Sequence, residues 1–315
     1  MKDMFDRDIY YLRLSVTDKC NLRCVYCMPE AGVVRRSHSE ILSVDEISEI
    51  VGAAAVCGIS KVRITGGEPL VRRGIVEICR RVAAVEGIGE VCLTTNGILL
   101  PEFASGLKAA GVNRINISLD SLNRVKYNEI TRFDALDDAL VGLYAALDAG
   151  FDVVKINAVL IGGVNDSDVL HLLKLTLKYK VDVRFIELMP IGECSGWSPD
   201  RFVSTQSVLS IAPDLHEVGL DGVAKQYMLP GGLGFVGLIN PVSSHFCPTC
   251  NRIRITPDGF LKPCLHSSEE VSLRGLHGEE LVDTIRNAIF NKPQRHDLFF
   301  DKQSSSIRNM NEIGG

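Results

Sequence analysis

The chain has 315 residues, of which 46% are hydrophobic and 23% charged, and its formal net charge is -5. This composition is typical of a globular protein with enough apolar residues for one or two domains. No apolar run approaches the roughly 20 residues of a membrane span, and the first ten residues lack the apolar core of a signal peptide. We therefore expect a cytoplasmic protein, and the acidic balance argues against binding to nucleic acid or to an acidic membrane surface.

Strand-like and helix-like runs alternate over the first two thirds of the chain. The strand-like runs cover residues 11–16, 61–65, 90–94, 114–118, 153–160 and 181–188. Between them lie amphipathic runs such as 43–58, where Ser43 and Glu46 fit a capping box and Gly58 fits a helix stop. This alternation predicts an α/β protein with a parallel sheet, either doubly wound or curled into part of a barrel. After about residue 195 the alternation ends, and shorter strand-like pieces at 223–229 and 234–240 predict a smaller α+β layer.

The expected strands carry polar side chains at every second position, although strands of parallel sheets are usually apolar throughout. The polar set comprises Arg13, Ser15, Lys61, Arg63, Thr65, Asn116, Ser118, Lys155 and Asn157. Because alternate residues share one face of a strand, the apolar set should meet the helices and the polar set should line the interior. Burying unpaired cations is costly, so this interior is expected to be wet or to hold an anionic ligand. An exposed polar face on an antiparallel sheet is the alternative.

Three cysteines, Cys20, Cys24 and Cys27, follow the first strand with the spacing C-x3-C-x2-C. Clustered thiols in a cytoplasmic protein indicate a metal or redox site, because disulfides are rare there. Three thiolates on a four-iron cluster leave one iron open for chemistry, whereas structural zinc needs a fourth ligand. His38 is the nearby residue that would complete a zinc site. The scattered cysteines are expected to be small buried apolar residues, namely Cys57, Cys79, Cys92 and Cys194.

A second group of three cysteines, Cys247, Cys250 and Cys264, has the spacing C-x2-C-x13-C. His245 or His266 would complete a zinc site here, so zinc remains an alternative to a second open cluster. Arg252 and Arg254 stand at alternate positions between the thiols, so both leave one face of an extended segment. Their guanidinium groups suit a phosphate ligand, although a solvated sheet edge would also account for them.

The first cysteine loop, with the aromatic Tyr26 before its last thiol, resembles the signature of the radical S-adenosylmethionine superfamily. The segment "GGEP" at residues 66–69 resembles the part of these enzymes that receives the methionine amino group. The resemblance implies a cluster whose open iron is chelated by S-adenosylmethionine. One-electron reduction then cleaves this cofactor to methionine and a 5′-deoxyadenosyl radical.

Longer segments resemble the branch of this superfamily that cyclises GTP at the start of molybdenum-cofactor biosynthesis. They are "LRLSVTDKCNLRCVYCMP", "VRITGGEPL", "LTTNG", "INISLDSL", "RFIELMPIG", "FCPTCNRIRITPDG" and the terminal "IGG". The resemblance implies an incomplete (βα)6 TIM-type barrel over residues 1–195. It also implies a C-terminal α+β domain over residues 196–315, which carries a second [4Fe-4S] cluster and ends in a Gly-Gly tail.

The same resemblance implies roles for individual residues. Contacts to S-adenosylmethionine are implied for Tyr26, Gly67, Ser118 and Met189. Contacts to GTP are implied for Arg13, Arg63, Thr94, Lys155, Arg252 and Arg254, with Lys61 and Arg184 as weaker candidates. The residues implied to act in catalysis are Arg252, Arg254, Gly314 and Gly315, and both cysteine groups are implied to hold [4Fe-4S] clusters.

The implied reaction removes hydrogen from C3′ of the GTP ribose and joins C3′ to C8 of guanine, giving 3′,8-cyclo-7,8-dihydro-GTP. Its implied partners are a one-electron reductant and the next, pterin-forming enzyme of the pathway, and the resemblance leaves room for a homodimer. Without the resemblance, Gly314 and Gly315 would be a frayed chain end. Two rival functions remain open at this point: a radical enzyme that modifies a peptide, and a zinc protein that binds nucleic acid.

Overall fold

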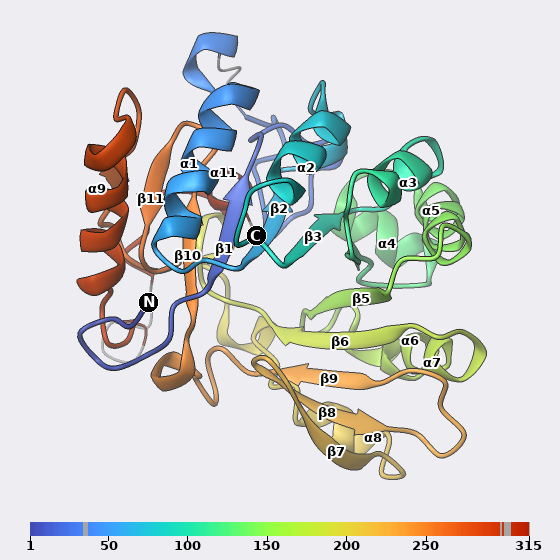
Figure 1. The fold of residues 1–315 in the computed structure, drawn as a ribbon. Helices are drawn as coiled ribbons and strands as arrows, with labels where there is room; N and C mark the ends of the chain where they lie inside the picture. Colours follow the sequence, from blue (N-terminus) through green and yellow to red (C-terminus); the bar gives the residue numbers. More distant parts are fainter. Residues whose placement is uncertain (34–36, 297, 299–303, 315) are drawn as a thin grey trace.

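The computed structural model describes residues 1–33, 37–296, 298 and 304–314 (Figure 1). Within these residues the centre of the sheet consists of six parallel strands that neighbour one another in chain order. They are β1 (Tyr11–Ser15), β2 (Lys61–Thr65), β3 (Glu90–Thr95), β4 (Arg114–Ser118), β5 (Val153–Leu160) and β6 (Asp182–Glu187). A doubly wound sheet reverses its strand order at a switch point, and this sheet does not. The partial barrel is therefore the correct one of the two expected arrangements, and each predicted strand ends within one residue of its observed limit.

Helices connect these strands and cover one face of the sheet (Figure 1). They are α1 (Val44–Val56), α2 (Ile75–Ala83), α3 (Leu100–Ala109), α4 (Arg124–Thr131), α5 (Leu136–Asp148), α6 (Val169–Leu173) and α7 (Leu175–Lys178). The capping box of α1 is confirmed, because the Ser43 side chain accepts from the backbone of Glu46 and the Glu46 side chain accepts from that of Ser43. Gly58 follows the helix at a φ of 90°, as the predicted helix stop requires.

The C-terminal strands extend the same sheet at both edges. At one edge, β9 (Val236–Ile239) pairs in parallel with β6, followed by the antiparallel β8 (Ala224–Met228) and β7 (His216–Asp221). At the other, β10 (Arg252–Ile255) pairs in parallel with β1, followed by the antiparallel β11 (Phe260–Lys262) and β12 (Val271–Ser272). The sequence predicts a smaller α+β layer after residue 195. In the structure β9 and β10 pair directly with β6 and β1, so the C-terminal strands are continuous with the sheet of the barrel. The division into residues 1–195 and 196–315 stays a prediction.

The remaining elements are short helices and turns. The α-helices are α8 (Ser207–Ile211), α9 (Gly278–Phe290), which lies beside α1, and α11 (Met310–Ile313) (Figure 1). The 3-10 turns are η1 (His38–Glu40), η2 (Pro69–Val71), η3 (Asp166–Asp168), η4 (Gly192–Cys194), η5 (Pro199–Arg201) and η6 (Cys247–Thr249). Among the residues described, no helix combines the length and apolar character needed to cross a bilayer.

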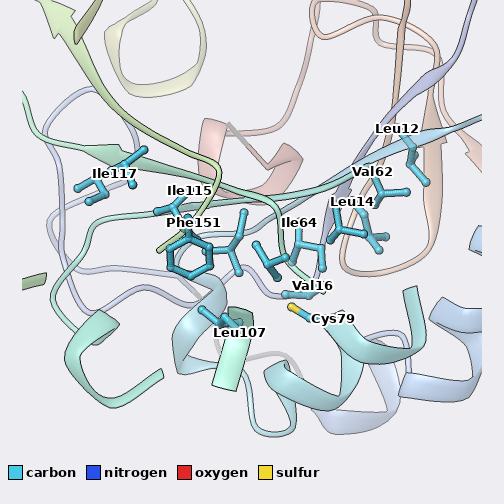
Figure 2. Close-up of a cluster of buried hydrophobic side chains, with 14 of the residues drawn as sticks. Leu12, Leu14, Val16, Val62, Ile64, Cys79, Leu107, Ile115, Ile117 and Phe151 are labelled. Atoms are coloured by element: carbon cyan, nitrogen blue, oxygen red, sulfur yellow. The ribbon is translucent and has the colours of Figure 1, made fainter. Parts of the chain in front are cut away.

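The core lies between the sheet and its helices, as the alternation of apolar residues predicts. Figure 2 shows Leu12 and Leu14 of β1 beside Val62 and Ile64 of β2, with Cys79 of α2 nearby. All are fully buried, and so are the other residues of the predicted apolar face, Ile115, Ile117, Val154 and Ile156. The four scattered cysteines are each at most 3% exposed, which confirms that they are buried. Cys57 and Cys79 belong to the hydrophobic core, whereas Cys92 lies near Arg13 and Arg63 on the polar face and Cys194 lies near Cys27.

Two helical glycines provide a stability test of this packing. A Cβ on Gly142 in α5 would lie 1.9 Å from the carbonyl oxygen of Gly97, whereas one on Gly52 in α1 would meet nothing within 4 Å. We expect Gly142→Ala to lower the unfolding free energy by about 1–3 kcal/mol or more, because the helix must move away from the turn. Gly52→Ala should raise it by up to about 1 kcal/mol through helix propensity. Urea titration of both variants measures the difference, and equal midpoints would show that α5 is not in tight contact.

Candidate active site

The polar face of the strands lies opposite the helices, and strand register brings its residues together. Arg13 on β1 stands next to Arg254 on β10 and next to Arg63 on β2. Thr94, Asn116 and Lys155 form a second row across β3, β4 and β5. Arg63, Arg254, Asn116 and Lys155 are all buried, so the inferred polar interior is confirmed and the exposed-face alternative is wrong.

The arginines of this interior are close enough to influence one another. Burial, together with the charges of Arg63 and Arg252, lowers the pKa of Arg13 to about 10. Burial also lowers the pKa of Arg254, and the charges of Arg13 and Arg252 lower it further. Arg63 donates from Nε to the Tyr11 hydroxyl and from Nη1 to Thr94 Oγ1 at 3.3 Å. Such a group of buried like charges is a site for an anion, and Tyr11 is a member that the sequence did not identify.

Lys155 and Arg184 form a separate group, which includes two carboxylates. Lys155 Nζ lies 2.8 Å from Asp182 Oδ2, and both Lys155 and Arg184 pair with Asp221. Burial of Asp221 raises the pKa of its carboxyl, but the charges of Arg184 and Lys155 outweigh burial and hold that pKa well below its usual value. Lys61 pairs with Glu90 at 2.6 Å, so it too is engaged by a carboxylate. The sequence suggested the cations of this group but not their acidic partners.

The first three thiols lie in the loop after β1 and are mutually close. The Cys27 amide donates to the Cys24 carbonyl at 2.9 Å, and the Leu22 amide donates to Cys20 Sγ at 3.3 Å. Burial raises the pKa of Cys20 to about 11. Burial also raises the pKa of Cys24, and the negative charges of Cys27, Asp120 and Cys20 raise it further. Such thiols become thiolates when a metal centre supplies positive charge, so this donor set fits an iron-sulfur cluster.

The residues implied to contact S-adenosylmethionine lie where parallel strands end, on the side of a barrel that carries chemistry. Ser118 ends β4, Gly67 follows β2 and Met189 follows β6. Tyr26 donates from its hydroxyl to Asp120 Oδ2 at 2.8 Å, and Asp120 Oδ1 accepts from the Val159 amide at 2.7 Å. The loop after β1 is thereby tied to the ends of β4 and β5.

Gly67 is in close contact with the loop that carries the first thiols. A Cβ at this position would lie 2.4 Å from the Lys19 carbonyl oxygen and 2.7 Å from that of Asp18. A glycine without a side chain allows such an approach to the backbone, and the group that makes it in the structure is the cysteine loop itself.

Glu68 and Asn96 also belong to the site, although the sequence analysis did not single them out. The buried Glu68 carboxylate accepts from Leu70 N at 2.9 Å, Thr95 Oγ1 at 2.8 Å and Asn96 N at 2.7 Å. Burial nevertheless raises the pKa of Glu68 to about 7. Asn96 Nδ2 in turn lies 3.8 Å from Cys20 Sγ. Both residues stand in quoted motifs, "GGEP" and "LTTNG", but only the fold reveals that the two motifs bind each other.

The second group of three thiols lies next to the barrel because β10, which follows Cys250, pairs with β1. Cys247 lies in η6, Cys250 precedes β10 and Cys264 follows β11. Burial of Cys250 raises the pKa of its thiol, but the charges of Arg252 and Lys292 outweigh burial and lower the pKa to about 7. The Arg252 guanidinium also lies 4.7 Å from the centre of the Phe246 ring. Cys250 is therefore readily a thiolate, which is the form that binds metal.

The zinc alternatives concern three histidines, His38, His245 and His266. Within the described residues, no three His, Cys, Asp or Glu side chains are placed to hold a single metal ion. A cluster spreads its ligands over several irons, so it does not need that arrangement. His266 lies 3.2 Å by Nδ1 from Ser304 Oγ, and burial together with His296 lowers its pKa to about 3. The centre of the His245 ring lies 5.7 Å from that of His296, and the side chain of His38 lies outside the described residues.

The C-terminal tail enters the interior of the barrel. Arg254 Nη1 donates to the Gly314 carbonyl at 2.9 Å, and Ile313 in α11 is fully buried. Gly314 has a φ of 83°, and a Cβ there would lie 2.4 Å from Thr65 Oγ1. The tail is therefore threaded rather than frayed up to Gly314, while Gly315 lies outside the described residues.

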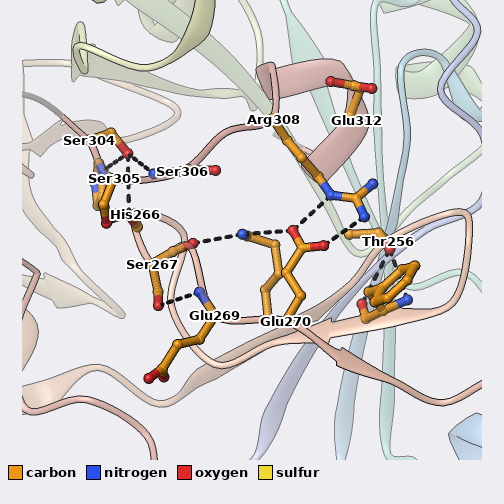
Figure 3. A network of polar contacts seen from close by, with 12 residues as sticks. Thr256, His266, Ser267, Glu269, Glu270, Ser304, Ser305, Ser306, Arg308 and Glu312 are labelled. Carbon is orange, nitrogen blue, oxygen red and sulfur yellow. Dashed lines mark hydrogen bonds and ion pairs between the residues drawn. The ribbon is translucent and has the colours of Figure 1, made fainter.

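The segment before α11 is held by polar contacts rather than loose. The polar sequence of residues 301–310 predicts a flexible tether, and residues 301–303 lie outside the described residues. Figure 3 shows Arg308 paired with Glu270, which also binds Lys262. Arg308 Nη1 contacts both oxygens of Asp258 at 3.0 Å, and Ser305 Oγ donates to the His266 carbonyl at 2.7 Å. The tail is thus fixed to the segment that carries the second thiol group.

Arg7 supports the second thiol group from the far end of the chain. Its Nε donates to Asp3 Oδ2 at 2.7 Å, and both groups are buried. Its remaining nitrogens donate to the carbonyls of Cys247, Lys292, Pro293 and Gln294. One buried guanidinium therefore joins the N-terminus to the Cys247 turn, an arrangement that no motif of the sequence predicts.

A partial barrel with three thiols after its first strand defines a class of enzymes, and comparison with known proteins agrees with this class. Residues 14–176 match the model of the radical SAM superfamily, and residues 181–298 match the model described as Molybdenum Cofactor Synthesis C. A GTP 3′,8-cyclase of Alkaliphilus oremlandii is 50% identical over 100% of both chains. One of Peptoclostridium acidaminophilum is 47% identical over 99% of this chain and 98% of its own. The chain therefore belongs to the radical SAM superfamily and, within it, to the GTP 3′,8-cyclase family.

Solved structures support the fold. Streptococcus suis SuiB bound to S-adenosylmethionine aligns with a TM-score of 0.63 over 97% of this chain and 77% of its own, at 14% identity. Methylornithine synthase (PylB) aligns with a TM-score of 0.54 over 96% of this chain and 80% of its own, at 15% identity. At such identities the likeness concerns the fold alone.

Removing the Arg7 side chain tests its supporting role. Arg7→Ala leaves the buried Asp3 carboxylate without its partner, so we expect a loss of about 3–5 kcal/mol of unfolding free energy. Lys2→Ala is the matched control, because Lys2 and Asp6 form an exposed pair with the same spacing, and we expect little change in its melting temperature. Thermal melting of both variants measures the difference, and a stable Arg7→Ala protein would contradict the assignment.

Proposed function

We propose that this protein converts GTP to 3′,8-cyclo-7,8-dihydro-GTP by radical S-adenosylmethionine chemistry, the first step of molybdenum-cofactor biosynthesis. The observation that carries the proposal is the buried group of cations in a barrel whose sheet also brings in two sets of three thiols. A triphosphate is the kind of ligand that would compensate this charge. Relatives that share half of the sequence over the full length carry the name of this activity.

The first thiol group would hold the cluster of the superfamily. Cys20, Cys24 and Cys27 supply three thiolates and leave one iron for S-adenosylmethionine. When bound, the cluster and this cofactor supply a 5′-deoxyadenosyl radical, which removes hydrogen from C3′ of the ribose. The residues proposed to hold the cofactor are Tyr26 in the loop itself and, at the strand ends that face the loop, Gly67, Ser118 and Met189.

The second thiol group would hold another [4Fe-4S] cluster. Cys247, Cys250 and Cys264 again supply three donors, and the low pKa of Cys250 favours metal binding. An iron without a protein ligand would be available to the guanine edge. Arg252 and Arg254 would then hold the substrate beside that iron.

The interior residues would bind and orient the nucleotide. We assign this role to Arg13, Arg63, Thr94, Lys155, Arg252 and Arg254, with Lys61 and Arg184 as further candidates. The buried Oδ1 atoms of Asn116 and Asn157 have no hydrogen-bond partner in the described structure, so they could accept from hydroxyl or amino groups of the ligands. Orienting C3′ toward the radical and excluding water are the protein's contributions to the reaction.

The remaining assignments follow from the same proposal. A one-electron reductant would serve the first cluster, and a pterin-forming enzyme would take the product, in the cytoplasm. A homodimer is compatible with the assignment. Residues 1–195 would form the cofactor-binding barrel, and residues 196–315 would supply the second cluster and the tail.

Anaerobic reconstitution, iron counting and incubation with GTP and S-adenosylmethionine test the function. We expect the wild type to bind two clusters and to form the cyclised product. Cys24→Ala should lose the iron of one cluster and all cleavage of S-adenosylmethionine, because its first cluster lacks a ligand. Cys79→Ala is the matched control, since Cys79 is a core thiol remote from both groups, and it should keep both clusters. A wild-type protein that is active with zinc alone would contradict the proposal.

The tail provides a further prediction. Deleting Gly314 and Gly315 should leave both clusters and uncoupled cleavage of S-adenosylmethionine nearly intact but reduce cyclised product at least about tenfold, because Arg254 loses a charge-assisted contact. Gly314→Ala should have a similar effect, since its Cβ would strike Thr65. A peptide ending in "MNEIGG" should restore part of the activity of the deletion variant. Ile307→Ala, at an exposed tail position, is the control, and wild-type turnover of the deletion variant would contradict the role.

A further inference from the structure

The carboxylate of Asp221, at the edge of the sheet, forms ion pairs with two cations of the interior. Asp221 ends β7, at the hairpin turn into β8, and its Oδ2 pairs with both Lys155 Nζ and Arg184 Nη2. Lys155 already has a second carboxylate, Asp182 Oδ2, at 2.8 Å. Lys155 would therefore keep a carboxylate partner if Asp221 moved away, so Asp221 can leave without stranding this buried lysine unpaired.

Other cations of the interior have partners of a different kind. Within the described ranges, Arg63 and Arg254 make no ion pair with a carboxylate, and they donate to neutral groups, the Tyr11 hydroxyl and the Gly314 carbonyl. The carboxylate side of the interior is the side with Lys155 and Arg184, where Asp182 and Asp221 are in place. The carboxylate side lies across the sheet, on β5 and β6.

The hairpin that carries Asp221 is suited to movement. β7 is the last strand of the sheet, and the side chains of Val218 and Leu220 are exposed. The ladder between β7 and β8 is interrupted between Glu217 and Gly219, where the pairing register shifts. Edge elements with few buried contacts and a bulge open at low cost.

The Arg184 side chain reaches this hairpin because the residue of β9 next to its aliphatic carbons is a glycine, Gly237. A Cβ on Gly237 would lie 2.8 Å from Arg184 Cγ and 3.3 Å from the Cβ of Ala224. The absence of that atom leaves a path for the arginine from β6 over β9 to the turn. Arg184 and Asp221 are therefore positioned toward each other by the backbone, and their contact does not depend on a chance rotamer.

We propose that Asp221 occupies the cations Lys155 and Arg184 in the free enzyme and is displaced by the polyphosphate chain of the substrate. The inference rests on the proposed function, which assigns Lys155 to GTP. A polyphosphate carries several charges and spans both cations, so it outcompetes a single carboxylate, whereas a ligand with little charge does not. Asp221 thereby lowers the affinity for polyphosphates, which must displace it, more than the affinity for nucleotides that leave it in place.

Binding to the reconstituted enzyme tests this inference with inorganic triphosphate as the first probe, and with GTP and GMP as the others. Asp221→Asn and Asp221→Ala should bind inorganic triphosphate and GTP about tenfold more tightly than wild type, because one charge-assisted contact of the competing state is removed. Affinity for GMP should change less than affinity for GTP in the same variants, because GMP leaves Asp221 in place. Asp214→Asn removes the same charge from an exposed position nearby and should match wild type.

Hydrogen exchange on the wild type gives a second measurement that needs no variant. Inorganic triphosphate should increase amide exchange over residues 216–224, because the hairpin is released when Asp221 leaves. Unchanged or slower exchange there, or unchanged or weaker triphosphate binding in both Asp221 variants, would overturn the inference. Failure of the proposed function is separate, because it would appear as a wild type that binds triphosphate but forms no cyclised product from GTP.

Discussion

The structure depends on keeping several cations buried in the interior of one partial barrel. Arg13, Arg63 and Arg254 are neighbours across three adjacent strands, and their charges repel in a region that water reaches poorly. The free protein offsets this repulsion with oxygen atoms, which include the Tyr11 and Thr94 hydroxyls at Arg63 and the Gly314 carbonyl at Arg254. The separate cations Lys155 and Arg184 are paired with the carboxylates of Asp182 and Asp221. The fold around the site is therefore organised by the same charge that would bind an anionic substrate.

Sheet topology explains how two thiol groups come to serve one interior. Because β10 pairs in parallel with β1, Cys250 precedes a strand that lies directly beside the one preceding Cys20. Arg7 and Asp3 then fix the Cys247 turn to the N-terminus, while Arg308 fixes the tail to the same C-terminal segment. Glu68 performs the equivalent task for the first loop by joining the ends of β2 and β3. Segments far apart in the sequence thus restrain both thiol groups.

Periodicity and motif spacing predicted the parts of this arrangement that depend on local sequence. The alternation of Arg13 with Leu12 and Leu14 determines which side chain meets the helices, and a two-residue period does not depend on the rest of the chain. The pairing of β9 and β10 with opposite edges could not be predicted in this way, because edge pairing is a long-range choice among several exposed strands. Asp221 stands before Gly222 in what is locally an ordinary hairpin turn, and its role depends on cations about 40 to 70 positions earlier in the chain.

The oxygen atoms that meet the cations come from opposite edges of the sheet. The Gly314 carbonyl approaches Arg254 on the β10 side, and Asp221 approaches Lys155 and Arg184 on the side where β7, β8 and β9 extend the sheet. Both groups belong to the C-terminal part of the chain, whereas Lys155 and Arg184 belong to the first six strands. A protein that offsets its own buried charge in this way remains folded without substrate, at the cost of some affinity. The part of the chain that supplies these oxygens can then influence substrate binding without altering the strands that carry the cations.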